Sequence, residues 1–420
     1  MEINEKFSLR DQNFSNAIDT INLARHRWYY YKEGFSPSLV ENAIDSLGLT
    51  SSDIIIDPFN GSGTVTLTAA MKEIKSFGFE VNPFTAFIAN TKVKRVDVST
   101  FDNVCQDVFS GVKEQKKSPL LTFSTFSENS NKSKWLFNAG VLNSFEGGIS
   151  RLNKVTNGDI KDILKLSLIG SAMDNSNARR DGKCLRYKNN WEELDFGKDS
   201  FLRALEKRLQ AIREDLLNDT ELTTPNIICG DSRSIIERDL TDKFSLCITS
   251  PPYLNTFDYT DIYRPELFLG QFINSMNELY DLRLNTVRSH VQAKWDKPTQ
   301  KNFGTLYDVA IKEILSRQNH LMHKNIPIMI QAYFEDMQSI LSTLKRKAKN
   351  NAELWLVVST SAYAGIEIPV DMIIGEIGNR SGWYLKDIGV LRYLKKRKSK
   401  YSNEINQLRE SVVIFAASGK

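Results

Sequence analysis

Seven short runs of apolar residues recur along the chain, and most are almost continuously apolar rather than alternating with polar residues. They occupy residues 53–58, 76–81, 226–230, 244–249, 353–359, 387–394 and 410–416. Short runs rich in Ile, Val and Phe are typical of strands covered on both faces, as in a mostly parallel sheet. Helical periodicity lies between them, for example over residues 65–74 and 331–348. The alternation of strand and helix predicts an α/β doubly wound sheet.

Two long segments interrupt this alternation, at residues 95–222 and 254–325. Both are largely helical in periodicity, so we expect them to form helical insertions in the sheet domain. Near the end of the chain, no long helix separates the runs 387–394 and 410–416. We therefore expect these two runs to form an antiparallel pair at one edge of the sheet.

The overall composition is that of an ordinary globular protein, because 41% of the 420 residues are hydrophobic and 25% are charged. The formal net charge of +4 permits a polyanionic partner but does not require one. The four cysteines show neither a CxxC spacing nor a zinc pattern with the four histidines, so we expect no metal site and a reducing, cytoplasmic setting. No apolar run approaches the roughly 18 residues of a membrane span, and the first residues have no apolar signal region, so no membrane contact is expected.

A glycine-containing loop, Asp57–Thr64 (DPFNGSGT), follows the first strand directly and precedes a helix. Gly61 and Gly63 let the backbone approach a ligand closely, and the start of the helix offers free N–H groups. The loop has neither the GxGxxG pattern of dinucleotide sites nor the lysine of a P-loop. It is a candidate nucleotide-binding or carboxylate-binding turn, although a plain strand-to-helix turn would carry the same glycines.

Acidic residues follow the ends of the second and third strands. The carboxylate of Glu80 can accept hydrogen bonds from both hydroxyls of a ribose. The simpler alternative is that Glu80 is only a solvated residue at the end of the strand. Asp231 can accept a hydrogen bond from an adenine amino group, or it can simply cap the next helix. A ligand with an adenosine half and an amino-acid half would use all of these groups, with Asp57 facing its ammonium.

The fourth strand leaves its apolar run through Thr249-Ser250-Pro251-Pro252-Tyr253. Two consecutive prolines remove two N–H donors and fix two φ angles, so the neighbouring carbonyl groups are held rigidly and lack local donors. These carbonyls are free to accept hydrogen bonds from another molecule. The other explanation is a rigid proline turn with an aromatic ring packed beneath it.

The two motifs together resemble those of the amino-group DNA methyltransferases, which use S-adenosylmethionine to methylate cytosine N4 or adenine N6. Asp57–Thr64 is similar to the cofactor loop of that family, DPFxGSGT, and Thr249–Tyr253 is similar to its catalytic motif in the TSPPY form. Phe35–Val40, followed by Glu41, resembles the segment that precedes the cofactor loop and helps to wall the cofactor pocket. The order of the motifs is the reverse of that in many family members.

The resemblance implies a seven-stranded, Rossmann-like sheet of the S-adenosylmethionine-dependent methyltransferase type, mostly parallel with an antiparallel edge strand. It also implies a set of site residues. Those expected to bind S-adenosylmethionine are Phe35, Ser36, Asp57, Pro58, Phe59, Gly61, Ser62, Gly63, Thr64, Glu80, Asn82, Asp231 and Thr249. Those expected to form the catalytic corner are Ser250, Pro251, Pro252 and Tyr253.

The implied chemistry starts from an exocyclic amine, which is a poor nucleophile because its lone pair is delocalised into the ring. The carbonyls of Ser250 and Pro251, with the Ser250 hydroxyl, would accept the two N–H groups and draw the nitrogen toward tetrahedral geometry. Tyr253 would stack on the base, which must first be flipped out of the duplex. In the family, Ser at the first motif position accompanies mostly cytosine N4, which favours cytosine N4 over adenine N6 in this chain.

The implied partner is double-stranded DNA, methylated at a specific site in a restriction-modification or defence system with a possible cognate restriction endonuclease. Methylation of RNA, or a non-catalytic DNA-binding subunit that keeps the motifs, are alternative functions. The sequence predicts neither the recognition site nor the oligomeric state.

The motifs divide the chain into five expected parts. Residues 1–94 would form the cofactor-binding half of the methyltransferase domain, 95–222 a helical insertion that could recognise DNA, and 223–253 the core with the catalytic motif. Residues 254–325 would form a second helical insertion near the target base or DNA. Residues 326–420 would form the C-terminal half of the domain.

Three shorter stretches are candidates for contacts with the substrate. Residues 174–191 mix Arg, Asn, Lys and aromatic side chains that suit phosphates and base edges, unless they form only a polar surface loop. Residues 254–264 follow the catalytic motif directly and are a candidate wall of the base pocket. The basic run 392–401 is either a loop that contacts phosphates or a solvated one.

Overall fold

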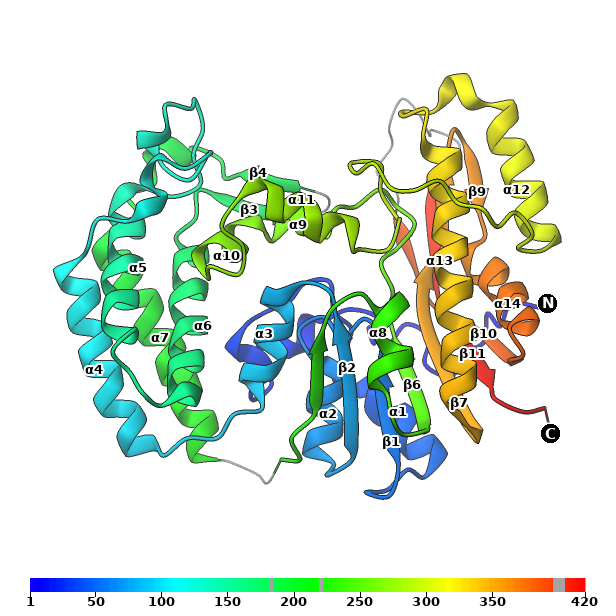
Figure 1. Cartoon of the computed structure of the whole chain (residues 1–420), viewed down its shortest axis with the longest axis horizontal. Coiled ribbons are helices and arrows are strands. Elements are labelled where there is room, and N and C mark those ends of the chain that lie inside the picture. The colour runs from blue at the N-terminus through cyan, green and yellow to red at the C-terminus, as the bar shows by residue number, and fades with distance from the viewer. Residues whose placement is uncertain (182–183, 219–221, 396–404, 420) are drawn as a thin grey trace.

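The chain folds into a twisted sheet with helices on both faces, and a lobe of helices stands beside one edge of that sheet (Figure 1). The computed structural model describes residues 1–181, 184–218, 222–395 and 405–419. Within these ranges, no helix is both long enough and apolar enough to cross a membrane.

The main sheet consists of the seven predicted strands. They are β1 Ile54–Asp57, β2 Lys75–Glu80, β5 Asn226–Cys229, β6 Phe244–Thr249, β7 Ala348–Ser359, β10 Tyr384–Lys395 and β11 Gln407–Ala416. Their order across the sheet is β10-β11-β7-β6-β1-β2-β5. The strands from β7 to β5 are parallel, whereas β11 is antiparallel to both of its neighbours. The predicted antiparallel pair at one edge is confirmed, and the reversed strand lies one place in from the edge itself.

Helices cover both faces of this sheet. They are α1 Pro37–Leu47, α2 Thr64–Met71, α3 Pro83–Lys92, α8 Ser232–Asp239, α12 Thr305–Ser316, α13 Ile326–Lys347 and α14 Val370–Arg380. α1 and α2 share one hydrophobic core with the sheet, and α8, α13 and α14 share another on the opposite face. The central strand β6 is buried at every position because it is covered from both sides. This two-sided burial explains why the strands are continuous apolar runs in the sequence.

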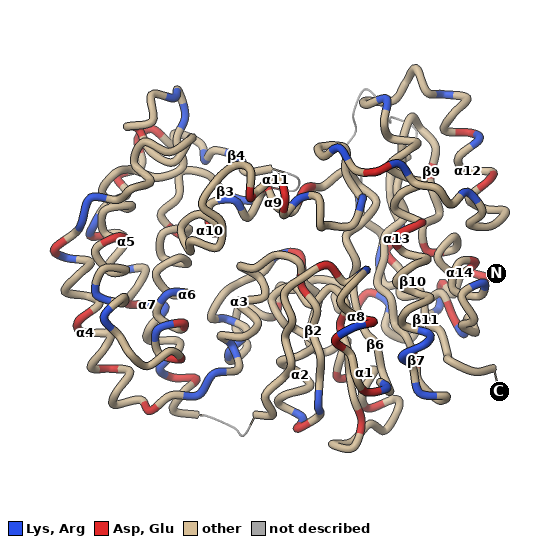
Figure 2. Tube along the Cα trace, in the orientation of Figure 1, with Lys and Arg blue, Asp and Glu red and all other residues tan. Residues whose placement is uncertain are grey.

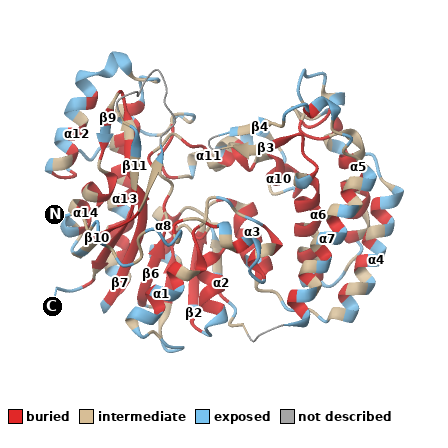
Figure 3. Cartoon of the chain, turned by 180° about the vertical axis from the view of Figure 1, so that it is seen from behind, coloured by how far each residue is buried: buried red, intermediate tan, exposed pale blue. Residues whose placement is uncertain are grey.

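The helical lobe is built from both of the long segments that interrupt the sheet. The first segment contributes α4 Val98–Glu114, α5 Ala139–Leu152, α6 Gly158–Asp174 and α7 Lys198–Leu217, and the second contributes α9 Tyr259–Ile262, α10 Arg264–Leu269 and α11 Met276–Leu284. Buried side chains from both segments form one hydrophobic cluster, visible as the buried interior of the lobe in Figure 3. Phe268 of α10 lies with its ring centre 4.5 Å from that of Phe123 and 5.9 Å from that of Phe126. Two segments that are distant in sequence therefore share one core.

Short elements complete the described structure. Two antiparallel ribbons pair β3 Ala178–Asp181 with β4 Cys184–Tyr187, and β8 Ser361–Tyr363 with β9 Ile366–Ile368. Short 3-10 helices lie at Ile18–Ile21, His26–Trp28, Pro119–Thr122, Glu128–Ser130, Trp191–Glu193 and Gln318–His320.

A buried carboxylate fastens the N-terminal segment to the lobe. Asp215 of α7 accepts hydrogen bonds from the backbone N–H of Arg25 at 2.8 Å, the Trp28 indole at 2.9 Å and the Arg27 guanidinium at 2.6 Å. These donors compensate for the loss of water around the carboxylate. The segment that follows Trp28 is thereby positioned between the lobe and the sheet.

The register of the parallel strands brings three polar residues to one edge of the sheet. Ile56 of β1 pairs with Cys247 of β6, so the two strands end within one residue of each other, at Asp57 and Thr249. β2 ends next to them at Glu80. In open α/β sheets, ligands bind in the crevice outside the carboxyl ends of the strands, which is where these side chains emerge.

The shared core of the lobe leads to a first prediction. Replacement of Phe268 by alanine should lower the free energy of unfolding by about 3–5 kcal/mol, because it removes a buried ring between the two segments. Urea denaturation measures this loss, and native-state hydrogen exchange should show reduced protection in residues 119–126 of the other segment. Leu315→Ala is the matched control, because Leu315 is 48% exposed on α12 and should change stability by no more than about 0.5 kcal/mol. Unchanged protection of residues 119–126 would contradict a common core.

Candidate active site

The glycine loop between β1 and α2 has the backbone shape that its glycines permit. Gly61 and Gly63 have φ angles of +49° and +84°, in the left-handed region that favours glycine. A Cβ atom on Gly63 would lie 2.7 Å from the Cβ atom of Ala89, so this glycine also allows α2 to approach α3. The ring of Tyr31 lies against Gly61, where an added Cβ would be 3.2 Å from the ring. The loop is therefore held between a helix on one side and an aromatic ring on the other.

Glu80, at the end of β2, braces this loop. Its carboxylate accepts hydrogen bonds from the backbone N–H of Gly61 at 2.7 Å and of Asn82 at 2.9 Å. Burial raises the pKa of Glu80, and these two hydrogen bonds oppose the rise. A carboxylate has about four acceptor positions, so some remain for the hydroxyl groups of a ligand.

Asp57 is a buried carboxylate at the carboxyl end of β1. It accepts hydrogen bonds from the Thr249 hydroxyl at 2.5 Å and from the backbone N–H of Phe59 at 2.9 Å. The pKa of Asp57 is raised to about 7, mainly by burial and to a smaller extent by the nearby Glu80 charge, and the two hydrogen bonds partly oppose this rise. No Lys or Arg among the described residues forms an ion pair with Asp57. A buried carboxylate of this kind is suited to binding a cationic group from a ligand.

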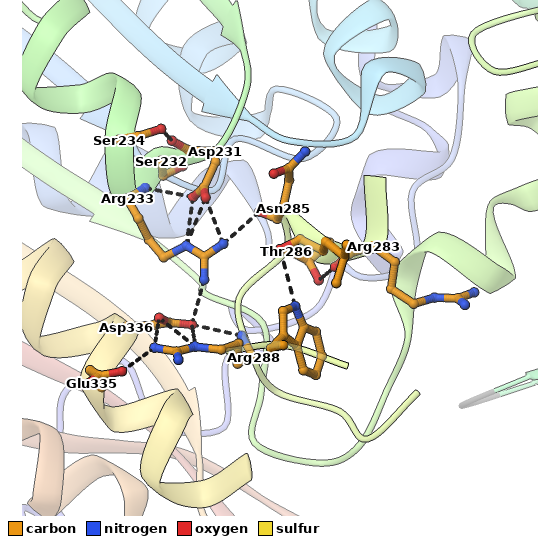
Figure 4. A network of polar contacts seen from close by, with 12 residues as sticks. Asp231, Ser232, Arg233, Ser234, Arg283, Asn285, Thr286, Arg288, Glu335 and Asp336 are labelled. Carbon is orange, nitrogen blue, oxygen red and sulfur yellow. Dashed lines mark hydrogen bonds and ion pairs between the residues drawn. The ribbon is translucent and has the colours of Figure 1, made fainter. Parts of the chain in front are cut away.

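Asp231, which the sequence predicts as an adenine contact, acts as a helix cap in the structure. Its carboxylate accepts a hydrogen bond from the backbone N–H of Arg233 at 2.9 Å at the start of α8. Both carboxylate oxygens also bind the Arg233 guanidinium, which reaches Asp336 of α13 at 3.0 Å. Asp336 in turn binds Arg288, which also contacts Glu335 (Figure 4). This chain of ion pairs fixes the loop that contains Arg288 to both α8 and α13.

The proline corner follows β6 and lies beside the glycine loop. The Ser250 hydroxyl donates a hydrogen bond to the Val357 carbonyl at 3.3 Å. The Tyr253 hydroxyl donates to Glu410 at 2.8 Å, and the other oxygen of Glu410 binds Arg392 at 2.6 Å. Burial and the charge of Glu410 raise the pKa of Tyr253 well above its usual value, so the phenol is the donor. The ring of Tyr253 is thus anchored at its polar end.

A single cavity of about 570 Å³ joins the loop and the corner. Most of the predicted site residues line it. They are Phe35, Asp57, Phe59, Gly61, Ser62, Thr64, Glu80, Asn82, Asp231, Ser250, Pro251, Pro252 and Tyr253. Residues from both predicted corners therefore face one space, as transfer of a group between two ligands requires.

Four predicted residues support the cavity from behind instead of lining it. Ser36 caps α1 by accepting a hydrogen bond from the backbone N–H of Ser38 at 3.1 Å. The Pro58 carbonyl accepts a hydrogen bond from Ser232, Gly63 allows the approach of two helices, and Thr249 holds Asp57.

Several cavity residues come from outside the two motifs. The stretch 254–264, which the sequence marks as a candidate wall, contributes Asn255, Phe257, Tyr259 and Thr260. Further residues that sequence reasoning did not single out as site residues are Ser15, Asn16, Tyr31, Lys32, Glu33, Gly34, Phe79, Val81, Ser232, Asn285, Thr286, Val287, Ser289, His290, Leu408 and Glu410. Glu410 carried one usable signal, because it is a carboxylate at the start of a strongly apolar run. Of the predicted basic run 392–401, Arg392, Leu394 and Lys395 line the cavity, and residues 396–401 lie outside the described residues.

The sheet order and the position of the cavity match one known architecture. A seven-stranded sheet with one reversed strand, β11, and a cavity at the carboxyl ends of its parallel strands is the architecture of the S-adenosylmethionine-dependent methyltransferases, as the sequence predicts. No protein-family model matches the chain.

Comparison with known proteins narrows this class. The chain is similar to the type II methyltransferase M.BsoBI of Geobacillus stearothermophilus, with 29% identity over an alignment of 450 residues that covers 94% of this chain and 86% of that protein. It is similar to the type II methyltransferase M.AvaI of Nostoc sp., with 27% identity over 87% of this chain and 80% of that protein. The predicted resemblance to amino-group DNA methyltransferases is thereby confirmed. A solved rRNA methyltransferase, aviRa from Streptomyces viridochromogenes, matches 91% of this chain and 85% of its own at 11% identity with a TM-score of 0.30, which is too distant to bear on the site.

The anchoring of Tyr253 leads to a second prediction. Tyr253→Phe should lower the free energy of unfolding by about 1.5–3 kcal/mol, because it removes a hydrogen bond to a charged, buried acceptor. Tyr384→Phe is the control, because Tyr384 is 55% exposed and should be close to neutral. In a background that carries Glu410→Ala, the same Tyr253→Phe change should cost almost nothing. Equal costs in the two backgrounds, measured by urea denaturation, would contradict the contact.

Proposed function

We propose that this protein is a site-specific DNA methyltransferase that transfers a methyl group from S-adenosylmethionine to the exocyclic amino group of a flipped base. The observation that carries the proposal is the single cavity of about 570 Å³ lined by both the glycine loop and the proline corner. The similarity to two proteins named type II methyltransferases supports it, and on the same grounds we propose a restriction-modification setting with a cognate endonuclease as partner.

The residues around the glycine loop fit the two halves of S-adenosylmethionine. Asp57, buried and without a cationic partner in the described chain, would receive the ammonium of the amino-acid half. Glu80 would use its remaining acceptor positions for the ribose hydroxyls, while Asp231 would meet the adenine amino group beside its ion pair with Arg233. When bound, S-adenosylmethionine supplies the electrophilic methyl group.

The proline corner would hold the target base. No described residue donates a hydrogen bond to the carbonyl of Ser250 or Pro251, so both carbonyls are available to the N–H groups of the base. By accepting these N–H groups at fixed positions, they favour a tetrahedral nitrogen whose lone pair leaves the plane of the ring. Tyr253, anchored by Glu410, would present its ring as a stacking surface. We propose cytosine N4 as the acceptor because Ser250 occupies the first position of the motif, with adenine N6 as the second candidate.

Methyl transfer is tested directly. Purified protein is incubated with labelled S-adenosylmethionine and unmethylated duplex DNA, and the DNA is digested to nucleosides for mass spectrometry. We expect N4-methylcytosine, and we expect Tyr253→Ala to abolish transfer while cofactor binding survives. Tyr384→Ala, far along the sheet edge, is the matched control and should retain activity. Cofactor binding without transfer to any DNA would contradict the proposal, N6-methyladenine would overturn only the choice of base, and label in RNA would favour an RNA methyltransferase.

The elevated pKa of Asp57 predicts a pH dependence of cofactor binding. The ionised carboxylate is the form that attracts an ammonium, and the pKa of about 7 in the free protein means that this form is lost as the pH falls through 7. Affinity for S-adenosylmethionine should therefore approach its plateau about one pH unit above this pKa and fall by up to about tenfold per pH unit below it. Calorimetry between about pH 5.5 and 8.5 measures this.

Asp57→Asn supplies the control for this dependence. The variant should bind S-adenosylmethionine more weakly at pH 7.5, and its affinity should vary little with pH, because the amide does not titrate. Identical pH profiles in the wild type and in Asp57→Asn would assign the titration to another group, such as Glu80, and would contradict the role given to Asp57.

A further inference from the structure

The β3–β4 ribbon is a small antiparallel pair that projects from the helical lobe, and neither of the two motifs accounts for it. Its register places Ala178 opposite Tyr187, Arg179 opposite Arg186, and Arg180 opposite Leu185. Directly paired residues in an antiparallel ribbon point to the same face, and successive residues point to opposite faces. The ribbon therefore has one face with Ala178, Arg180, Leu185 and Tyr187, and another with Arg179 and Arg186.

The first face is docked onto the lobe. Ala178 is buried in the hydrophobic cluster of the lobe, and Leu185 and Tyr187 pack against it. Arg180 forms an ion pair with the buried Glu266 of α10, and its guanidinium lies 4.2 Å from the centre of the Tyr263 ring. These contacts fix the ribbon in one orientation, so its other face is directed to solvent by a rigid support.

The second face carries an arrangement that does not stabilise the free protein. Arg179 and Arg186 are both exposed and lie directly across from each other, and like charges at directly opposed positions weaken a ribbon. Asp181 offsets part of this repulsion through an ion pair with Arg186 at 2.7 Å, but Arg179 forms no ion pair within the described ranges. A polyanion placed against this face would relieve the repulsion.

The ribbon also lies beside the mouth of the active-site cavity. β4 packs against α9, which follows the proline corner and places Tyr259 and Thr260 in the cavity wall. On the other side of the cavity, the segment that follows His290 carries exposed lysines at 294, 297 and 301. In Figure 2, the β3–β4 ribbon and the chain that follows α11 both lie above the carboxyl ends of the parallel strands.

We infer that duplex DNA docks on the outer face of the β3–β4 ribbon, with Arg179 and Arg186 bound to its phosphates, while the target base enters the cavity beside α9. This inference rests on the proposed function and names the element that holds its substrate. Duplex DNA carries about one negative charge per 1.7 Å of axis, so a stiff pair of guanidinium groups meets several phosphates at once. A two-stranded ribbon also has the dimensions that the major groove accepts.

The test measures binding of a fluorescein-labelled duplex of mixed sequence by anisotropy over a series of salt concentrations, from about 50 to 200 mM. In the double variant Arg179→Ala/Arg186→Ala, affinity should fall at least about tenfold, and the slope of log affinity against log salt should become shallower by about two, since each lost phosphate contact removes about 0.9. Asp181→Asn, which removes a negative charge from the same face, should strengthen binding. Under turnover, the double variant should show a raised KM for DNA with a nearly unchanged kcat, because neither arginine lines the cavity.

Arg238→Ala is the matched control. Arg238 is exposed and paired with Asp239 much as Arg186 is paired with Asp181, but it lies at the end of α8 remote from Asp231. Binding by this variant should match the wild type. An unchanged salt slope in the double variant, or a loss of affinity confined to an RNA hairpin probe, would overturn the inference. If the wild type itself methylates no DNA, the proposed function fails first. If it methylates DNA and the double variant binds as the wild type does, the inference about the ribbon fails alone.

Discussion

The hydrogen bond between Thr249 and Asp57 is the contact on which the arrangement of the site depends. It joins the ends of β6 and β1 at 2.5 Å, and it exists because these strands are neighbours in a parallel register. Thr249 belongs to the proline motif in sequence, but in space it supports the carboxylate of the glycine loop. The two motifs are about 190 residues apart in the chain, yet the pairing of β1 with β6 and this side-chain contact fix the distance between them. The sheet thereby sets the separation of the two ligands that the cavity can hold.

The walls of the cavity are held by charge as well as by packing. Asp336 is almost completely buried and is shared by Arg233 and Arg288, so the loop over residues 285–290 is tied to α8 and α13. Removing one member of such a buried set of ion pairs leaves a buried charge unpaired, which commonly lowers the free energy of unfolding by about 3–5 kcal/mol. On the opposite side, the cavity wall formed by residues 255–260 packs against the helical lobe. Residues 254–325 and residues 95–222 both contribute to the core of that lobe. The helical insertions are therefore part of the site's support, and the sheet alone does not enclose the cavity.

The sequence was informative wherever a local pattern had one physical cause. The seven strands were predictable because burial on both faces leaves continuous apolar runs, as in β6. The glycine loop and the proline corner were predictable because glycine and proline each restrict or permit particular backbone angles. Tyr31 and Glu410 were not singled out because their proximity to Gly61 and Tyr253 arises only when distant segments meet. The common core of the two insertions was not predictable either. Helical periodicity identifies the apolar face of a helix, but it does not indicate which other segment packs against that face.

The insertion of β11 between β7 and β10 has a consequence for the newly made chain. Glu410, the acceptor that anchors Tyr253, enters the sheet with this strand and follows all the other cavity residues in the chain. Until β11 has emerged, β10 has no partner strand in the sheet and Tyr253 has no acceptor for its hydroxyl at Glu410. The cavity can therefore be completed only after β11 has been translated and has paired with β7.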